Sequence, residues 1–198
     1  MTVARIAFAM GRAVLLLCAL LFTTPGIAWA QDSFSWRDID CPKSRILAWR
    51  GLICRESAVT TNQGRIGAFR QWAAFGSGPA GYHVHMFLAE AVNDASLAGD
   101  DAMSDFVKWM FGNGTRISGL SAVQRGADAD YMTFRDDRMA RDCVGFRRLG
   151  EFQRQGYVSL TGGILCAPPG TALTPDDVEL FIENVRLRPA ATTNAVSR

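Results

Sequence analysis

The first thirty residues constrain the fold of this chain most, because they have the pattern of an export signal. Two arginines precede an apolar run from Ala13 to Phe22, and a small-x-small pattern ends at Ala30, before Gln31. The run is shorter than the roughly 18 residues that a membrane-spanning helix needs. We therefore expect residues 1–30 to be cleaved from a periplasmic or secreted protein that keeps no stable membrane anchor.

Four cysteines follow this segment, and an even number in an exported chain favours disulfides. Three pairings are possible. The pairing of Cys41 with Cys54 and of Cys143 with Cys166 is favoured, because each bond then closes a short local loop. Neither pair has the spacing of a zinc knuckle, and the chain contains no Cys-x-x-Cys motif for thiol exchange. The sequence therefore predicts two structural disulfides.

Length and charge limit the classes of protein that remain. The hydrophobic content of 48% is typical of a globular core. The first thirty residues hold two of the 21 basic residues and none of the 19 acidic ones, so the rest of the chain is formally neutral. A neutral chain argues against a nucleic-acid partner. We expect one domain, residues 31–188, and a flexible C-terminal tail, residues 189–198.

Two segments have the periodicity of helices. Apolar side chains recur at helical spacing in residues 100–111, and acidic residues at the start suit the helix dipole. A second helix is predicted after Thr174, where Pro175 fits the first turn and Asp177 occupies the reciprocal capping position. The segment from Pro42 to Gly51 fits one or two helical turns or, alternatively, a hairpin.

Most of the remaining chain is β-prone. The candidate strands are residues 52–60, 66–75, 117–124, 129–135, 143–149 and 156–166, with a turn at residues 62–64. Short connections favour antiparallel pairing, and Gly162-Gly163 predicts a bulge or bend. The sequence therefore predicts a single α+β domain, in which two main helices pack on an antiparallel sheet.

Residues 76–81 read Gly-Ser-Gly-Pro-Ala-Gly, a literal G-x-G-x-x-G. Together with the segment that follows, this loop resembles the flavin-binding fingerprint of FAD-dependent oxidoreductases over some fifteen residues. The resemblance implies a dinucleotide held between a strand and a helix. His85 stands where the fingerprint has a small residue, and the rest of the chain looks antiparallel rather than Rossmann-like. We therefore expect a glycine loop and no cofactor, and residues 82–92 fit a helix or a strand.

His83 and His85 are the only histidines in the chain and are candidate metal ligands. On a strand they share one face, with Met86 on the other; on a helix they lie about 200° apart. Imidazole pairs suit copper or zinc. A third ligand would have to come from elsewhere, and Met132 and Met139 are candidates.

A group of acidic residues offers an alternative, enzymatic interpretation. Asp128, Asp130, Asp136 and Asp137 could perform acid–base chemistry or hold calcium, as in a carboxylate-dependent hydrolase of envelope glycan. Arginines are interleaved among them, which favours charge-balanced, solvated loops. No nucleophile signature such as G-x-S-x-G is present.

Arginines of the same region are candidates for binding an anionic partner. Arg138, Arg141 and Arg148 could contact phosphate or a charged glycan. Because no catalytic pattern emerges, the sequence favours an exported, disulfide-stabilised binding protein of the cell envelope, with an envelope protein or polymer as its partner. A glycan hydrolase and copper or zinc binding through His83 and His85 are the alternatives.

Overall fold

The computed structural model describes residues 36–60, 66–92, 95–99, 101–111, 116–126, 128–153 and 156–189. All of them belong to one unit, residues 32–198. The predicted signal peptide, the turn predicted at residues 62–64 and all but the first residue of the predicted tail lie outside the described residues.

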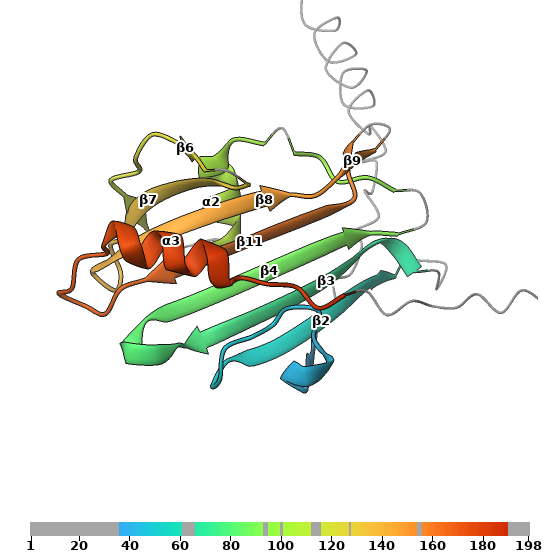
Figure 1. Cartoon of the computed structure of the whole chain (residues 1–198), viewed down its shortest axis with the longest axis horizontal. Helices are drawn as coiled ribbons and strands as arrows, with labels where there is room; N and C mark the ends of the chain where they lie inside the picture. Colours follow the sequence, from blue (N-terminus) through green and yellow to red (C-terminus); the bar gives the residue numbers. More distant parts are fainter. Residues whose placement is uncertain are drawn as a thin grey trace, which may run out of the picture. The chain divides into compact units, whose positions relative to one another are not determined.

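An antiparallel sheet of nine strands dominates the described chain (Figure 1). In sequence order its strands are β1 (Trp36–Ile39), β2 (Ile53–Thr60), β3 (Ile66–Ser77), β4 (His83–Ala91), β5 (Ile117–Ser118), β6 (Gln124–Arg125), β7 (Asp130–Asp136), β8 (Arg141–Leu149) and β11 (Ser159–Cys166). The spatial order is β1-β2-β3-β4-β11-β8-β7-β5, with β6 also paired to β7. Two short strands, β9 (Phe152–Gln153) and β10 (Gly156–Tyr157), form a separate pair. The predicted antiparallel pairing is confirmed.

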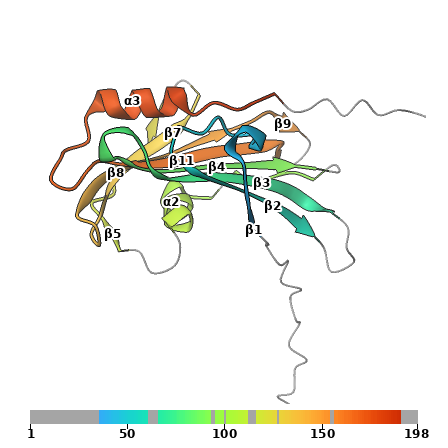
Figure 2. The same ribbon diagram turned by 90° about the horizontal axis from the view of Figure 1, so that it is seen from below.

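Two helices pack on opposite faces of this sheet (Figure 2). Helix α2 (Met103–Phe111) is 9 residues long and begins three residues after the predicted start, while α3 (Pro175–Asn184) has 10 residues. Short 3-10 turns, η2 (Cys41–Lys43) and η3 (Pro79–Gly81), complete the described helical structure. The helices are short and the sheet has nine strands, so strands far outweigh helices. The predicted α+β class therefore describes the molecule only loosely.

The predicted start of α3 is confirmed. The Asp177 backbone N–H donates to Thr174 Oγ1 at 3.2 Å, and the Thr174 N–H donates to Asp177 Oδ2 at 2.9 Å. This reciprocal pair satisfies two backbone donors that a helix start otherwise leaves free. Tyr82 ties the same carboxylate to the sheet, because its hydroxyl donates to Asp177 Oδ1 at 2.9 Å.

The glycine pair in β11 makes neither the bulge nor the bend that the sequence predicted. Gly162 and Gly163 pair in continuous register with both β4 and β8. Their role is close packing: a Cβ on Gly162 would collide with Phe106 of α2, and one on Gly163 would come within 2.9 Å of Phe181 of α3. Successive residues of a strand point to opposite faces, so each glycine makes room for one helix.

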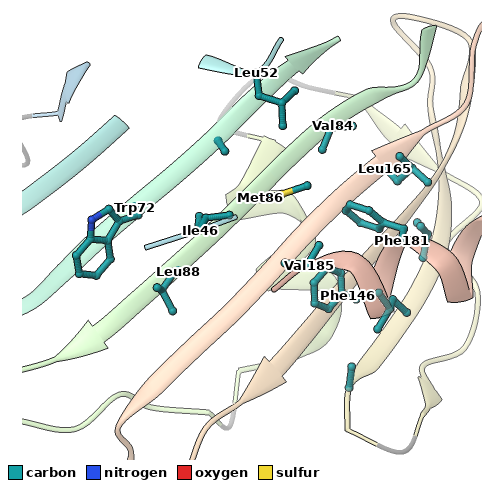
Figure 3. Packing of buried hydrophobic residues seen from close by; sticks show 14 of the residues in the cluster. Ile46, Leu52, Trp72, Val84, Met86, Leu88, Phe146, Leu165, Phe181 and Val185 are labelled. Atoms are coloured by element: carbon teal, nitrogen blue, oxygen red, sulfur yellow. The ribbon is translucent and has the colours of Figure 1, made fainter. Parts of the chain in front are cut away.

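Buried apolar side chains from α3 and from several strands pack together on the face under α3 (Figure 3). Phe181 of α3 packs edge-on against Phe146 of β8, with ring centroids 5.4 Å apart. Ile46, fully buried, pairs with Leu187 in an antiparallel bridge, so the segments before β2 and after α3 extend the cover. Further members of this core include Leu52, Trp72, Val84, Met86, Leu88, Leu165 and Val185.

The opposite face is covered only in part. Helix α2 contacts β7, β8 and β11 and buries Met103, Phe106, Val107 and Met110. In the described part of the chain, no second segment covers β1, β2 and β3 on this side (Figure 2). A shelf of sheet surface therefore lies beside α2.

Both predicted disulfides are present, one on each face. Cys41–Cys54 belongs to the core under α3, and Cys143–Cys166 belongs to the core under α2. The second bond joins residues that lie directly opposite each other on β8 and β11.

Candidate ligand pocket beside helix α2

A pocket of about 350 Å³ opens where α2 meets the uncovered shelf of the sheet. Successive side chains of a strand point to opposite faces of the sheet, so every second residue of β2, β3 and β4 faces the side of the sheet that holds this pocket. The register places Arg55 opposite Ala73, Ala73 opposite Phe87, and Phe75 opposite His85. The lining residues are Trp36, Arg55, Ala73, Phe75, His83, His85, Phe87, Trp109, Met110 and Phe111.

Aromatic rings form the walls of this pocket. Trp109 of α2 lies edge-on to Phe87, with ring centroids 4.8 Å apart. The Arg55 guanidinium stacks over the Phe75 ring at 5.1 Å and also binds Asp38 at 2.6 Å. At the rim, Trp36 is 38% exposed and Trp109 is 55% exposed. Large aromatic side chains left partly in water mark surfaces that contact other molecules.

The pocket also contains both histidines. Residues 82–92 are mainly strand rather than helix, so His83 and His85 lie on one face of β4 and both line the pocket. Burial, assisted by the neighbouring His83, lowers the pKa of His85 to about 4, and a hydrogen bond to the Met110 backbone opposes this shift. Partial burial of the ring and the Arg141 charge also lower the pKa of His83, against a weaker opposing effect of Asp136. His85 is therefore mainly neutral at pH 7, whereas His83 is exposed to solvent.

The methionine that joins the histidines is not one that the sequence suggested. Met86 lies on the opposite face, Met132 is buried under α2, and Met139 is exposed in the turn after β7. Met110 of α2 lines the pocket instead. In the sequence Met110 is one member of an apolar helix stripe, and nothing in that stripe indicates which member reaches the histidines. Among the described residues, no three His, Cys, Asp or Glu side chains gather into a metal-binding group.

The acidic residues considered for hydrolysis have separate partners. Asp136 is buried and accepts hydrogen bonds from the turn after β7, while the other three lie at different places on the surface. The contacts are Asp128 with Arg148 at 2.8 Å, Asp130 with Arg147 at 3.7 Å, Asp136 with the N–H groups of Arg138 and Met139 at 3.0 and 3.2 Å, and Asp137 with the Ser118 hydroxyl at 2.6 Å. These contacts explain the carboxylates as parts of the fold.

Of the three arginines considered for an anionic partner, Arg148 lies far from the other two. Arg148 donates to the carbonyls of Ile182 and Val185, both at 3.2 Å, and so satisfies the end of α3. Arg141 lies near His83 at the other end of β8, about 23 Å away at the usual rise of a strand. Arg138 lies in the turn after β7. The three arginines therefore do not form one cluster. Binding of an anionic partner by any one of them stays a prediction.

The glycine loop at residues 76–81 connects two strands. Residues 76 and 77 end β3, η3 spans Pro79–Gly81, and β4 begins at His83. A strand therefore stands where a dinucleotide fingerprint requires a helix. A hairpin lacks the helix N-terminus that would hold the pyrophosphate.

A second pocket, also of about 350 Å³, lies beside α3. Trp49, Tyr82 and Phe181 line it together with Leu180, which is 62% exposed. The tyrosine hydroxyl is bound to Asp177, and that carboxylate already caps α3. The tyrosine and the aspartate of this pocket are therefore engaged in holding α3 to the rest of the fold.

Two further observations bear on the compartment and kinship of the chain. The two disulfides are compatible with an exported protein in an oxidising environment. Among the described residues, none of the helices is long and apolar enough to cross a membrane. No family model, curated protein or solved structure matches this chain.

Proposed function

We propose that this protein is an exported binding protein of the cell envelope and that the rim of the pocket beside α2 is its docking site. One observation carries the proposal. Trp36 of β1, Ile53 of β2 and Trp109 of α2 are 38%, 50% and 55% exposed, and the two tryptophans line one pocket.

The composition of this rim supports a protein partner. Tryptophan and arginine dominate the binding energy of protein interfaces, and here Trp36, Trp109 and Arg55 line one pocket. Ile53 lies opposite Phe75 in the sheet and extends the apolar surface beside them. Strand β1, which carries Trp36, is at the edge of the sheet, so its free backbone groups can pair with an incoming strand.

The experiment is chemical cross-linking in the host, followed by affinity purification of the protein. The test variant combines Trp36→Ala with Trp109→Ala, and the control combines Leu180→Ala with Met139→Ala, which are 62% and 49% exposed elsewhere. We expect the wild type and the control to capture one discrete envelope protein, and the tryptophan variant to lose it.

Two outcomes would contradict this proposal. If the tryptophan variant captures as much partner as the control does, the docking site is not at the pocket. If the wild type binds envelope polymer from which proteins have been digested, and the tryptophan variant does not, the partner is a glycan rather than a protein.

A further inference from the structure

The lining of the pocket beside α2 includes two imidazoles and a thioether. His83 and His85 project from alternate positions of β4, and the two rings are close enough to affect each other's charge. The His85 ring is hydrogen-bonded to the backbone of Met110, so this methionine is its direct neighbour. All three residues line the same cavity.

We propose that His83, His85 and Met110 form a binding site for Cu(I). Two imidazole nitrogens and a thioether sulfur are soft or borderline ligands, a combination that favours Cu(I) over the harder divalent ions. A site of this kind requires no carboxylate, and the pocket lining contains none.

The charges around the pocket support a singly charged ion. Arg55 lines the cavity, and Arg141 acts on His83, so two cations face the site. Asp38 binds Arg55, and Asp136 partly offsets Arg141. The pocket lining includes an arginine and no carboxylate, so the remaining positive charge opposes a dication about twice as strongly as it opposes Cu(I).

The two histidines differ in exposure: His83 is exposed, and His85 is half-buried. Phe87 and Trp109 form an aromatic wall in the same pocket. The proposal goes beyond docking at the rim, and it does not depend on it.

The experiment is an anaerobic titration of the purified protein with Cu(I) against a chromogenic chelator, with ascorbate as reductant. We expect one Cu(I) per chain. His83→Gln, His85→Gln and Met110→Leu should each weaken binding at least about tenfold, since loss of even a supporting contact to a metal ligand has effects of that size. Met132→Leu is the matched control, because Met132 is buried in the same core but does not line the pocket.

X-ray absorption of the copper-loaded protein separates ligation from a purely structural role. A sulfur ligand should be present in the wild type and in Met132→Leu, and absent in Met110→Leu. No Cu(I) binding, or equal affinity of the two methionine variants, would overturn the site. If the protein does not bind Cu(I) and the tryptophan variant still loses its partner, only the copper proposal is wrong. If the protein binds Cu(I) and the tryptophan variant keeps its partner, only the docking proposal is wrong.

Discussion

The two faces of the sheet differ in how completely they are covered. Under α3, the helix and the paired segments around Ile46 and Leu187 close the surface over a continuous core. Under α2, the helix covers β7, β8 and β11, and none of the other described segments covers β1 to β3 on that side (Figure 2). The closed face keeps its polar groups occupied with the fold, as the bonds of Arg148 to the end of α3 show. On the open face His83, Trp36 and Trp109 are exposed, so we propose that the first face provides stability and the second provides binding.

The largest contrast should come from one aromatic truncation on each face. Phe181→Ala empties a fully buried position under α3 and should lower the free energy of unfolding by about 3–5 kcal/mol. Trp109→Ala, at a position 55% exposed, should cost less than about 2 kcal/mol. Urea denaturation measures both values, and equal losses would contradict the division between the faces.

The disulfides test whether the two faces are equally cross-linked. Replacing Cys41 and Cys54 by alanine removes a bond between residues 13 positions apart in the sequence. Replacing Cys143 and Cys166 removes one between residues 23 positions apart. In the chain-entropy model each loss is roughly 3 kcal/mol, with the longer loop slightly more costly. Thermal unfolding of the two double variants should therefore give similar losses. A much larger loss for one pair would show that this bond also holds native packing in place.

Acid should act through the open face. The pKa of His85 is lowered to about 4 in the folded state, so below its usual pKa of 6.5 the unfolded chain takes up a proton that the folded chain does not. The contribution of His85 to the free energy of unfolding is therefore fully present above about pH 6.5, and it is lost as the pH falls toward 4. The expected loss from this residue between pH 7 and pH 5 is about 2 kcal/mol.

Urea denaturation of copper-free protein at the two pH values measures this effect. His85→Gln removes the titrating group, and its stability should fall by correspondingly less over the same interval. An identical pH dependence in the wild type and in His85→Gln would show that the ring is accessible to protons in the folded protein.

The smallest effect concerns the cap of α3. Thr174→Ala removes the side chain that accepts from the Asp177 N–H and should cost about 1 kcal/mol. The Thr174 side chain and backbone hydrogen bonds, and more weakly Tyr82, also lower the pKa of Asp177, so the contribution of the cap should decline in acid. Denaturation at neutral pH measures the first effect, and a loss below about 0.3 kcal/mol would show that the Thr174 hydroxyl adds little to the cap.

Local chemistry made part of the fold predictable. The capping pattern Thr174 to Asp177 located the start of α3, the alternation of residues indicated most strands, and loop length favoured the disulfide pairs that form. The position of β11 between β4 and β8 could not be predicted, because it depends on pairing between segments far apart in the chain. The same limit explains Gly162 and Gly163, whose role depends on helices placed by that order.

For a related reason, the sequence predicted the two histidines of the candidate site and not the residues around them. His83 and His85 share a face because they are two residues apart on a strand, and this spacing can be read directly. Their neighbours Trp36, Trp109 and Met110 come from β1 and α2 and meet β4 only through the folded sheet. Conversely, the acidic group from Asp128 to Asp137 looked like a site because its members are close in sequence, yet its carboxylates bind separate partners.

Native mass spectrometry of the protein recovered from its host tests the central claim, that binding occurs on the open face, most directly. Three forms are compared: the wild type, a pocket variant with Trp36→Ala, His83→Gln and Trp109→Ala, and Leu180→Ala on the closed face. We predict a mass beyond that of the polypeptide, from copper or a partner, on the wild type and on Leu180→Ala, and its loss from the pocket variant. A bound mass that persists in the pocket variant but is lost in Leu180→Ala would contradict the account and assign binding to the closed face.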